Sequence, residues 1–228
     1  MQALDIVIGI LFIILSYFIG SIPFGVVLGK LICKKDIREY GSKNIGTTNA
    51  IRVLGKKVGF LVFFCDVFKG CFIIILIKIL GITNVWKTPE GIDIFLYGAA
   101  AILGHSFSIF LNFKGGKAVA TSLGVVLVLT PIPAIACLLM FALVFYTTKY
   151  VSLASTAATL TVIITTWILF VFGVKDILNF GYYFIAKPSL ILSILYTILA
   201  MLILIKHFKN YRRLLNGTEN SFRKNKKD

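Results

Sequence analysis

Gly41-Ser42-Lys43-Asn44-Ile45-Gly46-Thr47-Thr48-Asn49-Ala50-Ile51-Arg52 is a polar stretch with two glycines that lies between two long apolar runs. A strongly apolar chain has little reason to gather hydroxyl and amide groups unless they contact something polar. Glycine lets successive backbone N–H groups turn towards an anion, and Arg52 adds a planar cation suited to phosphate. The stretch therefore predicts a phosphate site with contributions from Gly41, Ser42, Asn44, Gly46, Thr48, Asn49 and Arg52.

A solvated loop, in which threonine and asparagine side chains only cap a helix, is the alternative interpretation of this stretch. The pattern is not a P-loop, because no Lys-Ser/Thr pair follows the second glycine. The other polar groups of the chain have to decide between the two interpretations.

The flanking apolar runs indicate the fold class. Of the 228 residues, 58% are hydrophobic and 14% are charged, and the mean hydropathy is +0.94. Soluble domains hold about 45–50% apolar and about 25% charged residues. The apolar runs are continuous and lack the alternation of membrane β-strands, which favours helices. We therefore predict an all-α integral membrane protein with one polytopic domain over residues 1–228 and a basic cytoplasmic tail at about 207–228.

Seven apolar segments have a length that suits a membrane crossing, although one of them is short. As a single helix the run 118–148 would reach roughly 45 Å, beyond the roughly 30 Å hydrocarbon core. Thr130-Pro131-Ile132-Pro133 divides this run, because proline removes a helical donor and disfavours helix before it. We therefore predict seven transmembrane helices, at about 4–29, 58–80, 94–111, 117–130, 132–148, 151–173 and 189–206, with 174–188 as a polar loop or short interfacial helix.

The basic residues predict the orientation in the membrane. The net charge is +15, and most lysines and arginines lie in the loop 30–57 and in the tail from Lys206. Cytoplasmic loops carry such an excess, which places the N-terminus outside and the C-terminus in the cytoplasm. In this setting the charge indicates anionic lipid or phosphate ligands rather than a nucleic-acid partner.

A second polar motif, Lys114-Gly115-Gly116-Lys117, precedes an apolar segment at the same predicted face. Glycines before a helix expose its unpaired N–H groups, and the two ammonium groups add positive charge. A phosphate site formed by these four residues is one interpretation. A tight turn with snorkelling lysines is the other.

Two further pairs of polar residues fall at the cytoplasmic ends of the predicted spans. His207 and Asn210 are three residues apart and share one helical face, and the same spacing relates Ser152 to Ser155. We expect the first pair to support a site, whereas serines at the start of a span often serve packing alone.

Within the predicted spans, Asp66 and Lys69 lie at i and i+3. Ionisable residues there are costly, and we expect these two to form an ion pair that anchors the first loop. His105 is expected to be structural. No nucleophile with a neighbouring base and no metal-ligand cluster is visible, so no metal or cofactor is predicted.

Five separated motifs resemble the acyl-phosphate:glycerol-3-phosphate acyltransferases, the PlsY family. They are Gly20-Ser21-Ile22-Pro23-Phe24-Gly25; Gly41-Ser42-x-Asn44-x-Gly46-x-Thr48-Asn49-x-x-Arg52-x-x-Gly55-Lys56-Lys57; Gly104-His105 with Phe113-Lys114-Gly115-Gly116-Lys117-x-Val119-Ala120-Thr121; Tyr150-Val151-Ser152-Leu153-Ala154-Ser155; and His207-x-x-Asn210-x-x-Arg213-Leu214-Leu215-x-Gly217-x-Glu219. The resemblance covers nearly the whole chain and implies a seven-span protein of the bacterial inner membrane with an external N-terminus.

The resemblance implies transfer of a fatty acyl group from acyl phosphate to the 1-hydroxyl of glycerol 3-phosphate, which gives lysophosphatidic acid and inorganic phosphate. Neither acyl-CoA nor acyl carrier protein would be the direct donor, in line with the missing His-x-x-x-x-Asp signature.

The family pattern also implies roles for individual residues. Ser42 and Arg52 would be essential active-site residues, and Lys117 and Ser155 would contact substrate phosphate. Gly115 and Gly116 would serve glycerol 3-phosphate binding. The tail would contribute His207 and Asn210 to activity and Glu219 mainly to structure.

Two positions depart from the family pattern, since Lys43 and Ala118 stand where glycine is usual. Neither carries a chemical role. Both leave the local backbone shape open.

The residue types suit a reaction between two anions without a covalent intermediate. We expect the loop 41–52, Lys117, Ser155 and His207 to form one pocket for two phosphates at the cytoplasmic face. The acyl chain would lie in an apolar groove between helices, open to the inner leaflet. A substrate phosphate would accept the hydroxyl proton, and His207 is the competing base. The alternative function is a phosphate or organic-anion transporter, but no internal repeat is visible and the polar motifs sit at one face.

Overall fold

The computed structural model describes residues 3–80, 92–172 and 189–222, and the secondary structure of these residues is entirely helical. They divide into two compact units, which we call the first unit (up to Pro131) and the second unit (from Ile132 onward). The all-α prediction is confirmed. The predicted loop or short interfacial helix at 174–188 lies outside the described residues.

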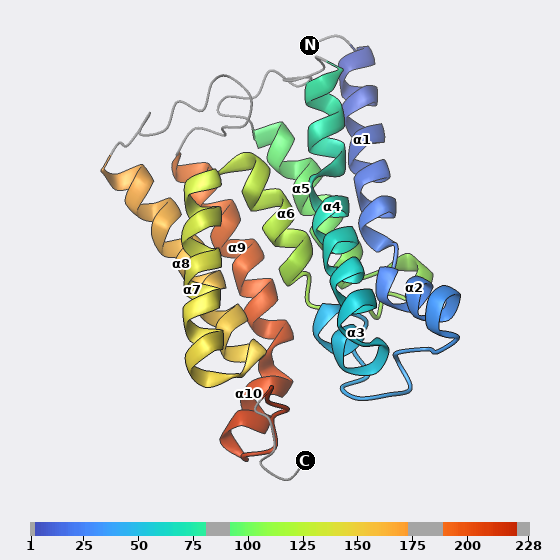
Figure 1. The fold of residues 1–228 in the computed structure, drawn as a ribbon. Helices are drawn as coiled ribbons and strands as arrows, with labels where there is room; N and C mark the ends of the chain where they lie inside the picture. The colour runs from blue at the N-terminus through green and yellow to red at the C-terminus, as the bar shows by residue number, and fades with distance from the viewer. Residues whose placement is uncertain (1–2, 81–91, 173–188, 223–228) are drawn as a thin grey trace. The chain divides into compact units, whose positions relative to one another are not determined.

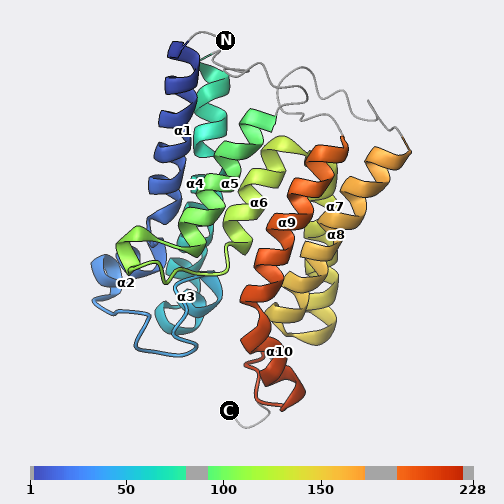
Figure 2. The ribbon, with the colours of Figure 1, turned by 180° about the vertical axis from the view of Figure 1, so that it is seen from behind.

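The first unit contains four long helices and three short ones. The short helices α2 (Phe24–Cys33) and α3 (Thr47–Leu54) lie together at the end of the long helices that is opposite to the N-terminus (Figures 1 and 2). The elements are α1 (Ala3–Ser21), α2 (Phe24–Cys33), α3 (Thr47–Leu54), α4 (Lys56–Ile79), α5 (Ile92–Ser106), the 3-10 helix η2 (Ile109–Leu111) and α6 (Val119–Leu129).

Glycines allow the long helices of the first unit to approach closely in pairs. A Cβ at Gly20 of α1 would overlap the backbone of α5, and one at Gly104 of α5 would overlap the backbone of α1. Gly70 of α4 and Gly124 of α6 stand in the same reciprocal relation. In membranes the hydrophobic effect does not drive helices together, and small residues such as glycine allow their backbones to approach closely and pack by van der Waals contact.

The predicted first span, 4–29, is too long. Helix α1 ends at Ser21 and α2 begins at Phe24, because Pro23 has no N–H to donate and disfavours helix at Ile22. At this break the Ile22 carbonyl oxygen accepts a hydrogen bond from Lys69 Nζ at 2.7 Å. Lys69 Nζ also lies 2.8 Å from Asp66 Oδ1, which confirms the predicted ion pair.

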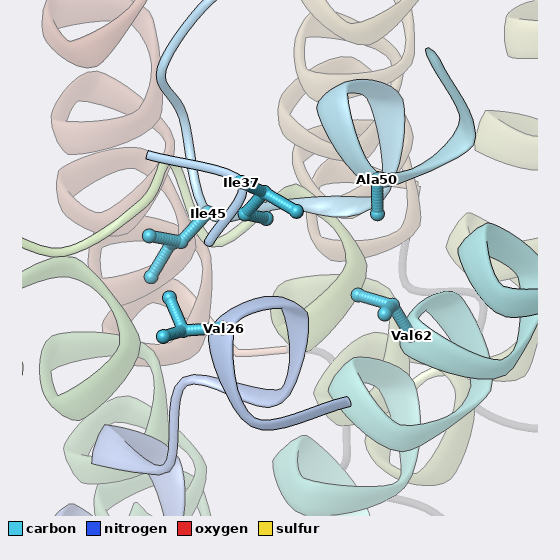
Figure 3. Packing of buried hydrophobic residues seen from close by; sticks show 5 residues of the cluster. All are labelled: Val26, Ile37, Ile45, Ala50 and Val62. Atoms are coloured by element: carbon cyan, nitrogen blue, oxygen red, sulfur yellow. The ribbon is translucent and has the colours of Figure 1, made fainter. Parts of the chain in front are cut away.

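A small apolar core holds the loop after α2 against the helices. It consists of Val26, Ile37, Ile45, Ala50 and Val62 (Figure 3). Leu111 of η2 packs against the same core, so the loop 34–46 and η2 have a common support. Fully burying an aliphatic side chain of this size contributes roughly 1.5–3 kcal/mol, which explains why so polar a loop is ordered.

The second unit consists of α7 (Pro131–Thr148), α8 (Val151–Val171), α9 (Leu190–Lys206) and α10 (Phe208–Leu215). The break predicted at Thr130 and Pro131 is present, since α6 ends at Leu129 and α7 begins at Pro131. Helices α9 and α10 meet at His207 with a bend of 48°.

Five helices in the described ranges are long and apolar enough to cross a membrane, and six if α9 and α10 count as one bent span. Helix α6 is shorter, with 11 residues. The coarse prediction of a multi-pass helical membrane protein is thereby supported.

Candidate active site

Asn49 organises the loop 41–52. Its side chain is 1% exposed, and its Oδ1 accepts a hydrogen bond from Ser42 N–H at 2.9 Å. Its Nδ2 lies 2.8–3.2 Å from three carbonyl oxygens, those of Ile37, Tyr40 and Asn44. The amide of Asn49 is therefore used by the loop itself, and this geometry fits a positioning role better than the predicted contact with phosphate.

Ser42, Thr48 and Arg52 are left half-buried at the edge of the same loop. Thr48 and Arg52 are four residues apart in α3 and so share one face of that helix. The N-cap of α3 is Gly46, whose own N–H donates to Asn44 Oδ1 at 3.0 Å. The first N–H groups of α3 have no partner inside the helix, which is the arrangement that anions use at helix starts.

Asp36 ties down the segment that leads into this loop. Its carboxylate accepts from Arg38 Nη2 at 2.6 Å and from Arg38 Nε at 2.9 Å, and Lys30 Nζ lies 3.2 Å away. The Arg38 side chain, which outweighs the opposing effect of burial, holds the pKa of Asp36 well below its ordinary value. The Asp36 carboxylate is therefore charged at neutral pH.

We expect an Asp36→Asn variant to lose at most about 1 kcal/mol, because ion pairs with exposed partners contribute little. A carboxyl whose pKa is depressed on folding stabilises the fold above its unfolded pKa, and this contribution is lost as pH falls through the folded value. Melting temperatures of wild type and variant should thus differ at pH 7 and begin to converge below about pH 4, the ordinary pKa of the unfolded carboxyl, with the rest of the difference lost only towards the lower folded pKa. A difference that stays constant down to pH 3 would contradict this account.

The second predicted motif, 114–117, forms a turn that lies on the end of α5. Gly116 N–H donates to the carbonyl oxygen of His105 at 2.9 Å. A Cβ at Gly115 would overlap the same carbonyl oxygen, and one at Gly116 would overlap His105 Nε2. Both glycines are therefore required by close packing, Lys114 is exposed, and Lys117 is half-buried at the start of α6.

The two departures from the family pattern, Lys43 and Ala118, both have a left-handed backbone conformation. Their φ angles are 57° and 58°, in the left-handed region that favours glycine. An L-residue pays about 1–2 kcal/mol there. The backbone therefore keeps the shape that glycine would take, even though glycine is absent.

Lys43→Gly and Ala118→Gly should each raise the free energy of unfolding by about 0.5–1 kcal/mol, because glycine enters this region without steric cost. Thermal unfolding in detergent measures the change. Ala157→Gly, in the middle of α8, is the matched control and should cost about 1 kcal/mol. Equal losses at all three positions would show that the left-handed backbone is not strained.

In the second unit, His207 is 2% exposed at the α9–α10 bend. Its Nδ1 lies 2.8 Å from the carbonyl oxygen of Ile203. A carbonyl oxygen can only accept, so Nδ1 is the donor in this contact; in a neutral ring this tautomer places the lone pair on Nε2. Ser155, also predicted, is buried in the second turn of α8, and its carbonyl oxygen accepts from Thr159.

Glu219 binds two side chains of α10. Its Oε1 accepts from Asn210 Nδ2 and its Oε2 accepts from Arg213 Nε, each at 2.7 Å. Burial by itself raises the pKa of Glu219, but its hydrogen bonds, that from Arg213 first, together with the charge of Arg213 outweigh burial, and the pKa lies below its ordinary value. Glu219 thereby holds the side chain of Asn210.

A chain reversal brings Glu219 back onto α10. Gly217 has a φ of 66°, Gly217 N–H donates to the Leu214 carbonyl oxygen, and Thr218 N–H donates to that of Arg213. These two bonds form a Schellman motif, the usual helix end around a left-handed glycine. The reversal continues to Phe222, whose N–H donates to the Lys149 carbonyl oxygen at 2.9 Å.

Of the predicted site residues, the stretch 41–52 and the turn 114–117 belong to the first unit, the former on the apolar core and the latter on the end of α5. Ser155, His207, Asn210 and Glu219 belong to the second unit. Sequence reasoning missed that Asp36 and Arg38 anchor the loop. Opposite charges two residues apart in a basic segment are the signal that could have found this pair. No group of three or more potential metal ligands occurs in the described ranges.

Five or six apolar helices of membrane-spanning length in the described ranges define a polytopic helical membrane protein, and its first unit carries two basic glycine-containing segments, 41–52 and 114–117. Residues 10–217 match the family described as glycerol-3-phosphate acyltransferase. The chain belongs to this family.

Similar proteins share most of their length with this chain. A glycerol-3-phosphate acyltransferase of Acholeplasma laidlawii is 43% identical over 232 residues, covering 96% of this chain and 94% of the relative. One of Fusobacterium nucleatum is 45% identical over 213 residues, covering 93% and 97%.

Two solved structures are also similar, both of PlsY, an integral membrane glycerol 3-phosphate acyltransferase. The glycerol 3-phosphate form has a TM-score of 0.77 and 37% identity, covering 94% of this chain and 96% of that one. The lysophosphatidic acid form has a TM-score of 0.75 and 36% identity, covering 94% and 95%. The resemblance found in the sequence motifs is confirmed.

Proposed function

We propose that the protein transfers a fatty acyl group from acyl phosphate to the 1-hydroxyl of glycerol 3-phosphate, with lysophosphatidic acid and inorganic phosphate as products. The observation that carries this proposal is the similarity over 94% of the chain to PlsY in its glycerol 3-phosphate form. The family match spans residues 10–217 and so includes residues of both units. We therefore propose that residues 1–228 act as one acyltransferase domain.

In the proposed mechanism, the groups of the first unit position and neutralise anions. The stretch 41–52 contributes Ser42, the first N–H groups of α3 and Arg52. Lys117 adds an ammonium group at the start of α6. Acyl phosphate is a mixed anhydride with a good leaving group, so stabilisation of the developing oxyanion and of the departing phosphate is the main demand. The substrate hydroxyl attacks directly, without an acyl-enzyme.

A substrate phosphate accepts the hydroxyl proton in this mechanism. We assign Ser155 to phosphate contact, and His207 and Asn210 to support of activity, with Glu219 holding Asn210. His207 is the competing base, because its tautomer leaves a lone pair on Nε2.

His207→Ala separates the two proton acceptors. We expect this variant to retain measurable turnover, lowered by about 10-fold to 100-fold, because a base-free route remains open. The kcat and both KM values are measured at pH 6 to 9. Complete loss of turnover in a folded variant that still binds both substrates would assign the base to His207.

We propose that the chain crosses the bacterial inner membrane seven times, with an external N-terminus and a cytoplasmic site. The crossings are α1, α4, α5 with η2, α6, α7, α8 and α9. With 11 residues, α6 reaches roughly half of the hydrocarbon core. Residues 112–118, which precede α6, are not helical. Non-helical backbone is tolerated within the depth of a membrane where it is buried in protein, and Gly116 and Ala118 are buried in this way.

Thiol labelling tests this topology. Cysteines introduced at Asp5 and at Lys209 are exposed to a membrane-impermeant maleimide in intact cells and in inverted vesicles. The first should react in cells and the second in vesicles. Labelling of both on one side would contradict an odd number of crossings.

A panel of acyl donors tests the reaction. Purified protein is given glycerol 3-phosphate with palmitoyl phosphate, palmitoyl-CoA or palmitoyl-acyl carrier protein, and lysophosphatidic acid is quantified. Only palmitoyl phosphate should yield product. Phosphate uptake into proteoliposomes without acyl transfer would favour the transporter alternative.

A further inference from the structure

Three buried ionisable side chains lie together beneath the turn 114–117. Asp66, Lys69 and His105 are each no more than 4% exposed, and they come from α4 and α5 of the first unit. The proposed mechanism uses none of them. Ionisable groups within a membrane span are costly, so a group of three calls for an explanation beyond packing.

His105 forms the surface on which the turn lies. The imidazole is so close to Gly116 that a Cβ there would overlap Nε2, and the backbone of His105 accepts the Gly116 N–H at 2.9 Å. The side chain and the main chain of one residue thus both contact one glycine. A change in the ring position is passed directly to the backbone between Lys114 and Lys117.

Asp66 lies on the other side of the imidazole. Its Oδ1 is 3.7 Å from His105 Nδ1, which is an electrostatic contact longer than a hydrogen bond. Lys69 Nζ, at 2.8 Å, holds the same oxygen and also binds the Ile22 carbonyl oxygen at the α1–α2 break. Lys69 therefore ties the Asp66 carboxylate to the α1–α2 break, and the ring lies between this carboxylate and the turn.

We propose that His105 is a positioning residue for the phosphate of glycerol 3-phosphate, and that Asp66, held by Lys69, keeps the imidazole in place. The inference rests on the proposed function of the turn. It adds a specific role for residues that touch no substrate: they set the direction of the N–H groups and of Lys117 at the start of α6. Affinity for glycerol 3-phosphate should depend on them more than affinity for the acyl donor does.

A double-mutant cycle tests this contact. Gly116→Ala alone should raise the KM for glycerol 3-phosphate at least 30-fold, because the new methyl group collides with the ring. His105→Ala alone should raise it about tenfold. In the His105→Ala background the collision is absent, so Gly116→Ala should add less than threefold. The KM for acyl phosphate should change less than twofold throughout.

Asp66→Asn supplies a second, independent variant. It should raise the KM for glycerol 3-phosphate about threefold in the wild-type background and have no further effect after His105→Ala. The matched control is Ser16→Ala, which removes a fully buried polar group of the first unit that does not belong to the cluster of Asp66, Lys69 and His105. Both KM values should be unchanged in it. If the His105→Ala protein is unstable, His105→Asn serves the same cycle.

Binding is also measured without turnover, as the rise in melting temperature with glycerol 3-phosphate, with glycerol as the control ligand. Wild type should respond, and His105→Ala should lose most of the response. If wild type and His105→Ala respond equally, the positioning role of His105 is overturned but the proposed function is not. Additive effects of the two substitutions in the cycle would have the same consequence. A wild type that does not respond would overturn both this role and the proposed function.

Discussion

Replacement of Arg52 by lysine should lower kcat/KM by about 100-fold or more. Lysine keeps the charge but loses the planar fork that binds phosphate through two parallel hydrogen bonds. Removal of one such preorganised donor typically costs about 10²–10³ in rate. Arg52 lies at the fourth residue after Thr48 on one face of α3, at the edge of the loop that Asn49 holds. Steady-state rates with both substrates varied provide the measurement.

Arg212→Lys is the control for this change, because Arg212 is an exposed guanidinium on α10 with no assigned role. Its kcat/KM should stay within twofold of wild type. Activity of Arg52→Lys within threefold of wild type would show that charge alone suffices, and the bidentate role of Arg52 would be wrong.

The second large effect is expected from Asn49→Asp. The substitution hardly changes shape, but it replaces the Nδ2 donor, which lies beside three carbonyl oxygens, with a fourth oxygen. The loss of three hydrogen bonds and the repulsion between buried oxygens should cost at least about 3 kcal/mol, since each unsatisfied buried group costs about 1–3 kcal/mol. The melting temperature should fall and activity should be almost abolished.

Asn49→Ala separates the two effects of this residue. It removes the bonds without the repulsion, so its loss of stability should be smaller than that of Asn49→Asp. Melting temperatures of the two variants, measured together, give the comparison. An Asn49→Asp protein as stable as wild type would contradict the hydrogen-bond network of the loop.

Features that depend on local pattern were predictable from the sequence. The ion pair of Asp66 with Lys69 follows from their spacing in an apolar run, and the break before Pro131 follows from proline chemistry. The helical membrane class follows from composition. The resemblance to the family followed from the order of five motifs, and it was confirmed by the comparisons.

Features that depend on distant partners were not predictable. Pro23 breaks the first helix, yet the apolar run continues past it, so hydropathy alone extended the span to residue 29. Asn49 was grouped with ligands because its partners, such as the Ile37 carbonyl oxygen, come from backbone that residue type cannot reveal. The left-handed backbone at Lys43 likewise has no signature in a lysine.

The stoichiometry of the products is the most direct test of the proposed reaction, in which one acyl phosphate and one glycerol 3-phosphate give one lysophosphatidic acid and one inorganic phosphate. Purified full-length protein is incubated with palmitoyl phosphate and glycerol 3-phosphate, and inorganic phosphate and lysophosphatidic acid are measured in the same sample. We expect equal amounts of both products, and neither product when glycerol 3-phosphate is omitted. Phosphate release without lysophosphatidic acid, or the absence of both products from a folded protein, would contradict it.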